Sequence, residues 1–330
     1  MSRTNIAIIA AGFLMVWGTG LRAISIETVP VDNPGNAGQL SGTGAGGYGQ
    51  NRVCGAVDYA YNIGKYAVTA GQYTAFLNAV AATDTYGLYN ASMWTNVYGC
   101  KIERYAGSGT PVDPYQYRVA SEYANRPVNY VSWGDAARFV NWLHNGQPTG
   151  NQVPGTTETG AYTLNGALTN AELLAVSRNA NWKWAITSED EWYKAAYYNP
   201  STDSYYKYPT SSNVIDTSMA NYDWSVGHTT DVGAYPYSSP SGTFDQGGNV
   251  WEWNESVEVL HDNVYRGIRG GSFFNDDSLA IGLQASTREM NYPANEGAHL
   301  GFRVSQVPEP GSALLLLIGC TGMVLRSRRA

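Results

Sequence analysis

Residues 247–253 have the sequence GGNVWEW, and the interpretation of the whole chain starts from this stretch. Gly247 and Gly248 permit a tight turn, because glycine reaches backbone conformations that residues with a Cβ atom resist. After the turn, Trp251 and Trp253 alternate with Glu252, so the two indoles point to one side and the carboxylate to the other. The pattern predicts two core tryptophans and a glutamate that faces a polar partner.

Helices are predicted where a Ser or Thr precedes an amphipathic run. Thr69 is followed by Gln72, and Ser188 by Glu191, at the spacing of a capping box. Ser132 begins a third run. The predicted buried faces are Tyr73, Phe76, Leu77 and Val80; Ala136, Phe139, Val140 and Leu143; and Trp192, Ala195 and Ala196. A strand is predicted by the alternation of Trp182, Trp184 and Ile186.

Five further strings accompany the first one in a fixed order. They are IGKYAVT at 63–69, RPVNYVSW at 126–133, TSEDEWYKAA at 187–196, RGGS at 269–272 and GFR at 301–303. The set resembles the formylglycine-generating enzyme family, or sulfatase-modifying factors, over residues 57–305. The resemblance implies one α+β domain with a C-type-lectin-like fold, in which a few helices surround short antiparallel strands. We expect the arginines of the last two strings, Arg269 and Arg303, to anchor this fold by pairing with carboxylates.

The resemblance also implies a structural calcium ion at the first turn. Its ligands would be Asp245, the backbone carbonyls of Gly248 and Val250, and Glu252, which are the hard oxygen donors that calcium requires. The alternative is that Asp245 caps a turn and Glu252 pairs with an arginine. A second family calcium site would begin at Asn221 and Tyr222, with Asp231 or Asp223 as its carboxylate.

Catalysis is where the sequence departs from the family. Family members that make formylglycine bind copper(I) through two cysteines that follow the RGGS string, since soft thiolates suit this ion. The matching positions hold Asn275 and Ala280. The four histidines, His144, His228, His261 and His299, share no metal-binding spacing. We therefore expect neither bound copper nor formylglycine formation.

The function expected from these observations is that of a non-catalytic binding or structural module. Tyr and Trp are frequent in the irregular segments 84–127 and 199–245. Such side chains stack on sugars or grip peptides at little entropic cost, so the ligand is either a peptide or a glycan. Two alternatives stay open: an oxidoreductase of the sulfatase-modifying type that acts through an unrecognised site, and an accessory that presents peptide without oxidising it.

The N-terminal residues are typical of an exported protein. Residues 1–23 combine Arg3, a short apolar run and small residues before a cleavage point, as in a signal peptide. Residues 24–56 are expected to form a flexible leader. Their glycine run at 42–47 fits G-x-G-x-x-G, but no apolar strand precedes it and no helix follows, which excludes a dinucleotide site.

The C-terminal residues 306–330 resemble a PEP-CTERM sorting signal. Pro308-Glu309-Pro310 precedes an apolar run at 311–325 and an arginine cluster. The resemblance implies an exosortase as partner, transient retention in the inner membrane, and a final location at the cell surface or outside the cell. A plain tail anchor is the alternative.

Composition narrows the remaining choices. The chain has 330 residues and is 43% hydrophobic and 14% charged, which excludes a charge-rich disordered protein. Acidic residues exceed basic ones by 27 to 20, so a nucleic-acid binder is not expected. Of three cysteines, Cys320 falls in the apolar C-terminal run. Cys54 and Cys100 are predicted to form a disulfide in an oxidising compartment, with two separate buried thiols as the alternative.

Overall fold

In the described part of the chain helices are few and most strands are short, as predicted, and the strand at Trp251–Leu260, with 10 residues, is the longest. The computed structural model describes residues 23–274 and 280–308. The helices are α1 (Ala70–Val80), α2 (Ser92–Thr95), α3 (Trp133–His144), α4 (Asn170–Ala175) and α5 (Glu189–Tyr197), with 3-10 turns η1 (Thr43–Ala45), η2 (Ser121–Tyr123) and η3 (Ile281–Leu283). The strands are β1 (Thr28–Val31), β2 (Gln39–Ser41), β3 (Arg52–Cys54), β4 (Tyr61–Gly64), β5 (Ile102–Ala106), β6 (Gln116–Val119), β7 (Trp184–Ile186), β8 (Tyr198–Asn199), β9 (Ser204–Tyr205), β10 (Trp251–Leu260), β11 (Asn263–Arg269), β12 (Glu289–Asn291), β13 (Leu300–Phe302) and β14 (Val304–Gln306).

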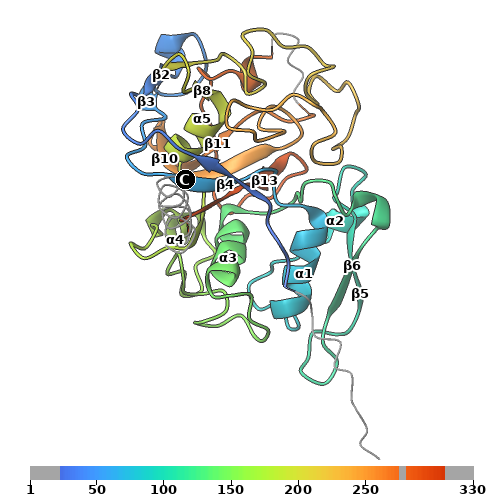
Figure 1. Cartoon of the computed structure of the whole chain (residues 1–330). Coiled ribbons are helices and arrows are strands. Elements are labelled where there is room, and N and C mark those ends of the chain that lie inside the picture. The colour runs from blue at the N-terminus through green and yellow to red at the C-terminus, as the bar shows by residue number, and fades with distance from the viewer. Residues whose placement is uncertain (1–22, 275–279, 309–330) are drawn as a thin grey trace, which may run out of the picture.

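Two four-stranded sheets form the framework, and the chain passes from one to the other at Arg303. One sheet has the order β1-β4-β14-β7, and the other has the order β12-β11-β10-β13. Strand β13 runs parallel to β10 and ends at Phe302, while β14 begins at Val304. In the view of Figure 1, α1 and α3 lie below β4 and β13, and α5 lies above them. Arg303, the arginine of the GFR string, therefore lies between the two sheets.

The predicted helix starts are confirmed. The side chains of Thr69 and Ser188 each accept a hydrogen bond from the backbone N–H of the third residue of the helix. The side chains of those third residues, Gln72 and Glu191, accept a hydrogen bond from the backbone N–H of the cap residue. Ser132 does the same, with Asp135 as its box partner. Every residue assigned to a buried helix face is buried. The local signals of capping and periodicity were sufficient here.

The main core is aromatic. The ring of Phe139 on α3 meets the rings of Phe76 and Phe302 edge-on, with both pairs of centroids 5.3 Å apart. Trp251 and Trp253 belong to the same buried cluster, as predicted. The Trp253 indole N–H donates to the Val131 carbonyl at 3.0 Å, so this large side chain is buried without losing its polar partner.

The prediction of a flexible leader over residues 24–56 is wrong. Strand β1 pairs with β4, and β2 pairs with β3. The backbone of Ile24 both donates to and accepts from the side-chain amide of Gln147, at 2.7 and 2.9 Å. A Cβ atom on Gly47 would lie 2.2 Å from the Ser286 carbonyl oxygen. The glycine run thus serves a close backbone approach, and the domain begins before residue 57.

The targeting signals fall mainly on residues 1–22 and 309–330, which lie outside the described residues. The signal peptide and the sorting signal therefore stay predictions. Within residues 23–274 and 280–308, no helix combines the length and the hydropathy that crossing a membrane requires.

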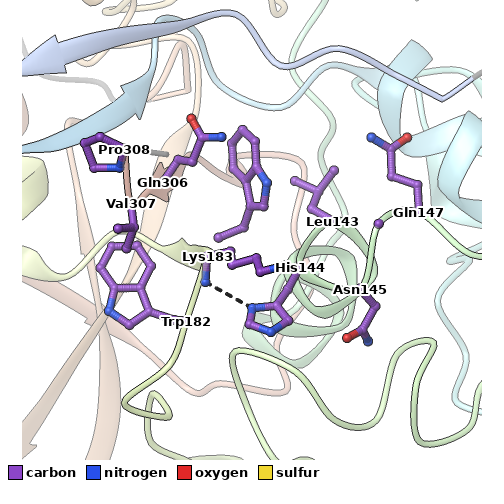
Figure 2. Close-up of a pocket in the computed structure, with 11 residues that line it drawn as sticks. Leu143, His144, Asn145, Gln147, Trp182, Lys183, Gln306, Val307 and Pro308 are labelled. Carbon is purple, nitrogen blue, oxygen red and sulfur yellow. Dashed lines mark hydrogen bonds between the residues drawn. The ribbon is translucent and has the colours of Figure 1, made fainter. Parts of the chain in front are cut away.

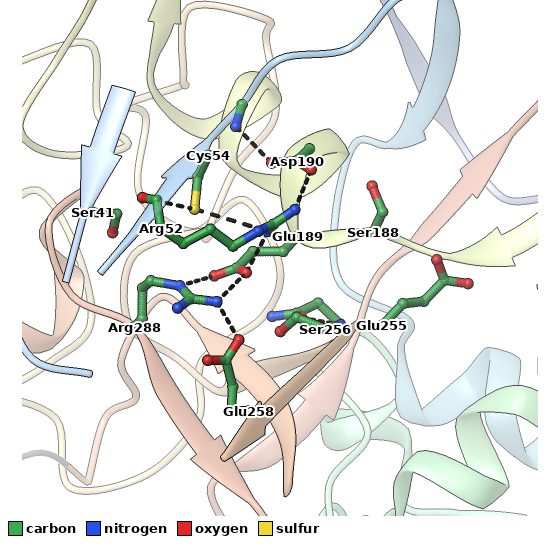
Figure 3. Close-up of polar contacts among 12 residues, drawn as sticks. Ser41, Arg52, Cys54, Ser188, Glu189, Asp190, Glu255, Ser256, Glu258 and Arg288 are labelled. Carbon is green, nitrogen blue, oxygen red and sulfur yellow. Dashed lines mark hydrogen bonds and ion pairs between the residues drawn. The ribbon is translucent and has the colours of Figure 1, made fainter. Parts of the chain in front are cut away.

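A buried carboxylate, Glu189 at the start of α5, joins three arginines from distant segments. Figure 3 shows two of them, Arg52 and Arg288, beside Glu189. Arg52 on β3, Arg269 on β11 and Arg288 approach its oxygens to 2.6, 2.7 and 2.7 Å. Burial opposes ionisation of Glu189, but the three guanidinium groups outweigh it and hold its pKa far below the usual range. Arg288 also pairs with Glu258.

A second buried pair joins the two sheets. Arg303 donates from Nε and Nη2 to the two carboxylate oxygens of Glu252, at 3.0 and 2.9 Å. The indole N–H of Trp192 on α5 donates to the same carboxylate at 2.6 Å. Arg303 also donates to the carbonyls of Gly64 and Phe244. The expected pairing of Arg269 and Arg303 with carboxylates is therefore confirmed.

The predicted disulfide between Cys54 and Cys100 is wrong. Both are buried free thiols, and they lie in different hydrophobic clusters. The sulfur of Cys54 lies 3.3 Å from Nη2 of Arg269, whereas Cys100 packs in the main core beside Asn129. Burial raises the pKa of each thiol to about 11. The alternative of two separate structural thiols is what the structure contains.

We expect Glu189→Gln to destabilise the fold strongly, because it leaves several buried guanidinium groups without their countercharge. Removing one partner of a buried ion pair costs about 3–5 kcal/mol of unfolding free energy. The matched control is Glu103→Gln, whose partner Arg118 is largely exposed and whose loss should cost about 0–1 kcal/mol. Urea denaturation measures both, and equal losses would contradict the role assigned to Glu189.

Candidate functional site

The turn before β10 lies against the segment around Asn221. Asn221 and Gly248 form a parallel bridge, and the Asn249 N–H donates to the Asn221 carbonyl at 2.8 Å. Gly248 has a φ of +80°, and a Cβ atom there would lie 2.2 Å from the Asn221 carbonyl oxygen. Only glycine permits this approach. It places the turn at Gly248 beside Asn221, so the two segments that the sequence predicts to bind calcium are neighbours.

Asp245 is a partly buried carboxylate at the start of this turn. Its backbone is left-handed, with φ 58°, and its Oδ2 accepts the Gly233 N–H at 2.6 Å. Burial raises its pKa to about 6, and nearby Glu252 adds to this, while the Gly233 N–H and Arg303 act in the opposite direction. Asp245 thus caps a turn, as the alternative interpretation of the sequence had it.

Glu252 also follows that alternative interpretation, since it pairs with Arg303. Its Oε2 accepts from both Trp192 and Arg303, and its Oε1 accepts from Arg303 at 2.9 Å. A carboxylate oxygen has two lone-pair directions, so a bond to an arginine and a bond to a cation are compatible. The calcium prediction at Asp245, Gly248, Val250 and Glu252 stays a prediction.

At the second predicted calcium segment, one oxygen stands out. Asn221 donates from Nδ2 to the His228 carbonyl at 2.9 Å, but its Oδ1 is buried and has no hydrogen-bond partner among the described residues. The backbone carbonyl of Tyr222 accepts the Ser225 N–H at 3.1 Å. Asp231 is exposed and lies 3.9 Å from the guanidinium of Arg126. The Oδ1 atom of Asn221 therefore has lone pairs available to bind a cation in this segment.

The positions that match the copper-binding cysteines are only partly described. Asn275 lies outside the described residues. Ala280 has a left-handed backbone with φ 50° and precedes η3. Its methyl group is buried in a small cluster with Tyr208, Ala220, Tyr222 and Leu283. The site that the resemblance assigns to a thiolate is therefore an apolar packing position.

Five rings, those of Tyr98, Trp224, Phe273, Phe274 and His299, contact one another and form an aromatic patch. The rings of Trp224 and Phe274 have centroids 4.5 Å apart, and Phe274 and His299 are stacked at 6.0 Å. Trp224 is 38% exposed and Phe274 is 40% exposed. The Trp224 N–H donates to the Phe273 carbonyl at 3.1 Å, and Trp224 follows Asp223 in a second consecutive left-handed conformation, both with φ 55°.

Sequence analysis singled out the segments 84–127 and 199–245, which contain Tyr98 and Trp224, but it predicted no surface that joins them to Phe273, Phe274 and His299. The available signal was the pair Phe273-Phe274 directly after RGGS, immediately before the position of a replaced cysteine. Trp224 carried no comparable signal, because its contacts with Phe273 and Phe274 join segments about fifty residues apart.

Two carboxyl groups are hydrogen-bonded to each other: Asp135 in the first turn of α3, and Glu296 in the segment that leads to His299. Asp135 accepts from the Ser132 N–H and hydroxyl at 2.9 and 2.6 Å, and Glu296 accepts from Asn90. Burial raises the pKa of Glu296 to about 8, and repulsion from Asp135 adds to the effect. The pair shares a proton at neutral pH.

This pair predicts that stability falls as pH rises from about 4.5 to about 8. The folded state keeps a proton on Glu296 across that range, whereas the unfolded chain has released it. The contribution of Glu296 to stability is fully present below the pKa of the unfolded chain, about 4.5, and it is lost as pH rises through the folded-state pKa of about 8. Glu296→Gln should flatten this decline in pH-dependent urea denaturation. Glu172→Gln, at an exposed helix cap, should leave the decline unchanged, and an unchanged slope in Glu296→Gln would contradict the assignment.

Two solved structures resemble this chain over most of its length. The Treponema denticola variable protein 1 has a TM-score of 0.57 and 18% identity, covering 87% of this chain and 97% of its own. CarF has a TM-score of 0.52 and 18% identity, covering 86% and 99%. These matches establish the fold, and the predicted C-type-lectin-like α+β class is confirmed.

Curated relatives include enzymes and an inactive protein. The hercynine oxygenase of Mycobacterium tuberculosis is 24% identical over 271 residues, covering 74% of this chain and 52% of the relative. The formylglycine-generating enzyme of Streptomyces coelicolor is 24% identical over 279 residues, covering 74% and 77%. The inactive C-alpha-formylglycine-generating enzyme 2 of Bos taurus is 25% identical over 181 residues, covering 54% and 49%. The chain thus spans about half the length of the first and the last of these.

A family model matches nearly the whole described fold. It is the sulfatase-modifying factor enzyme 1-like domain, and it covers residues 51–307. The match includes the GGNVWEW, RGGS and GFR strings and both buried ion pairs that contain Arg269 and Arg303. The chain therefore belongs to the sulfatase-modifying factor enzyme 1-like domain family.

Proposed function

We propose that the chain is an exported, non-catalytic member of this family that binds a peptide or glycan through the aromatic patch. The observation that carries the proposal is the combination of an exposed aromatic surface with an apolar packing position at Ala280, where the resemblance requires a thiolate. The described geometry supports recognition there better than copper chemistry. The location is the cell surface or the extracellular space, reached through an exosortase.

The patch has the physical properties of a recognition surface. Trp224 and Phe274 expose large rings that have few rotatable bonds, so binding costs little side-chain entropy. Their edge-to-face contacts with Phe273 and Tyr98 fix the rings before a ligand arrives. The left-handed backbone at Trp224 costs energy that the surrounding contacts must offset, and such strain is concentrated at functional sites.

Calcium is the structural ion that we propose for the turn before β10. The donors there are oxygens: the Asp245 carboxylate, the carbonyls of Gly248 and Val250, and Glu252. Such ligands fit calcium rather than a soft metal. Calcium would neutralise the Asp245 carboxylate, since Arg303 already balances Glu252, and would tie the turn to β10. The orphaned Oδ1 of Asn221 supports a second ion beside Tyr222, with Asp231 or Asp223 as its acidic ligand.

The relatives support two other functions. The hercynine oxygenase and the formylglycine-generating enzymes favour an oxidoreductase that acts through residues not recognised in this chain. The inactive C-alpha-formylglycine-generating enzyme 2 favours a protein that binds its ligand without oxidising it. The second agrees better with Ala280 and includes the peptide-presenting accessory.

We expect no oxidation of a Cys-containing sulfatase peptide by the purified chain, even with copper(I) and oxygen. The reason is that Asn275 and Ala280 supply no thiolate. Mass spectrometry of the peptide measures the conversion of its cysteine to formylglycine. Conversion that a copper chelator abolishes would overturn the non-catalytic proposal and favour the oxidoreductase.

The binding proposal is tested with a displayed random-peptide library and a glycan array. A ligand captured in either screen should lose affinity by about tenfold or more in Trp224→Ala and Phe274→Ala, because central aromatic residues dominate binding energy. The control is Trp94→Ala, since Trp94 is 39% exposed and lies outside the patch. Equal losses in all three variants, or ligands insensitive to the two patch variants, would refute the patch as the binding surface.

Calcium should stabilise the wild-type protein, because a ligand bound only by the folded state adds about 2.7 kcal/mol when its free concentration is about 100 times Kd. Asp245→Asn should abolish this gain while keeping the turn, since the amide oxygen can still accept the Gly233 N–H. Asp216→Asn, at an exposed turn, is the control. Melting curves with calcium and with EDTA measure the effect, and identical curves for the wild-type protein would remove the ion from the proposal.

A further inference from the structure

A cavity of about 720 Å³ lies away from the aromatic patch, between the end of α3, the start of β7 and the end of β14 (Figure 2). Its volume is within the range of about 300–1,000 Å³ that is usual for small-molecule sites. The residues that line it are Leu143, His144, Asn145, Gly146, Gln147, Trp182, Lys183, Trp184, Gln306, Val307 and Pro308. No part of the site described above contributes to it.

Two tryptophans give the cavity flat apolar surfaces. Trp182 and Trp184 alternate along the chain, and both are partly exposed while packing against the main core. The guanidinium of Arg178 lies 4.3 Å from the Trp182 ring centroid, and Tyr59 meets the same ring edge-on. These contacts hold the Trp182 indole in place. Fixed indoles with polar neighbours suit a ligand that has one apolar face and many hydroxyl groups.

The charge of the cavity is opposite to that of the whole chain. The formal net charge of the chain is −7, yet the described lining residues include Lys183 and no acidic side chain. Within the described part of the chain, the Lys183 ammonium forms no ion pair. It lies close enough to His144 to lower the pKa of that imidazole, an effect to which burial contributes most. A cavity of this kind attracts an anion.

His144 provides a directed donor beside this ammonium. Its Nδ1 lies 3.1 Å from the Lys183 backbone nitrogen and accepts that N–H. In the neutral ring the proton is therefore on Nε2, which makes Nε2 a donor. The Lys183 ammonium and the His144 imidazole N–H are two donors in the same lining, and a carboxylate has two oxygens to accept from them.

The walls of the cavity are fixed before any ligand binds. The Val307 N–H donates to the Lys183 carbonyl at 3.0 Å, and the Gln306 side chain accepts from Asn62. The Gln147 amide is held by the backbone of Ile24, and Asn145 donates to the carbonyls of Thr156 and Thr159. Such preorganisation reduces the entropy that binding would otherwise cost.

We propose that this cavity is a second binding site, which takes a hexuronate unit of an acidic polysaccharide. The sugar ring packs against Trp182 and Trp184, and its carboxylate lies at Lys183 and His144. The donor and acceptor capacity that the Asn145, Gln147 and Gln306 amides keep beyond their wall contacts serves the hydroxyl groups. This site is independent of the proposed function, because it shares no residue with the aromatic patch and would act whether or not the patch binds a ligand.

The test is calorimetric titration of the full chain with tetragalacturonate, using maltotetraose as the uncharged comparison. We expect tetragalacturonate to bind, more weakly at high salt, and at least tenfold more tightly than maltotetraose. Lys183→Gln should reduce tetragalacturonate affinity at least tenfold, and this exposed side chain can be replaced without disturbing the core. Trp184→Ala should reduce the affinity for both sugars.

Two controls keep the test decisive. Lys65→Gln changes a partly exposed lysine that pairs with Glu27 elsewhere on the molecule, and it should leave binding unchanged. Trp94→Ala should also leave it unchanged. Absence of tetragalacturonate binding, equal affinity for the two sugars, or an equal effect of Lys183→Gln and Lys65→Gln would each overturn the proposal. Loss of binding only in the aromatic-patch variant Trp224→Ala would overturn it as well.

Discussion

The buried pair between Glu252 and Arg303 is the contact on which the rest of the fold depends. It joins β10 of one sheet to the residue at which the chain enters the other, and Trp192 brings α5 to the same carboxylate. The carboxylate of Glu189 then connects α5 to β3, β11 and Arg288. Because buried charges are costly unless matched, these contacts tolerate few other arrangements of the segments that meet there.

This framework separates structural from recognition residues. The strings that identify the family supply Glu189, Glu252, Arg269 and Arg303, and all four are buried in ion pairs. The exposed aromatic rings and the Trp-lined cavity belong to segments that the ion pairs support but do not include. Ala280, one of the two positions that the resemblance assigns to a thiolate, packs in a small apolar cluster and takes no part in these ion pairs.

Sequence patterns predicted the features that depend on local physics. Capping boxes located the helices at Thr69 and Ser188, the apolar periodicity after Ser132 located a third, and alternation placed Trp251 and Trp253 in the core. The failures involved contacts between distant segments. A glycine-rich run such as the one around Gly47 is compatible with either a mobile segment or close backbone packing. The contact with the Ser286 backbone, which the sequence does not reveal, shows that it is close packing. Likewise, the pairing of Cys54 with Cys100 was inferred from the expected compartment, while geometry places them in separate clusters.

The central claim is that the family motifs of this chain serve the fold, and a double-mutant cycle on Glu252 and Arg303 tests it most directly. Unfolding free energies would be measured by urea denaturation for Glu252→Gln, Arg303→Met and the double variant. The account predicts that the double variant loses less than the sum of the single losses, with a coupling energy of about 1–3 kcal/mol. Additive losses would show that the two side chains do not stabilise the fold as a pair and would contradict the account.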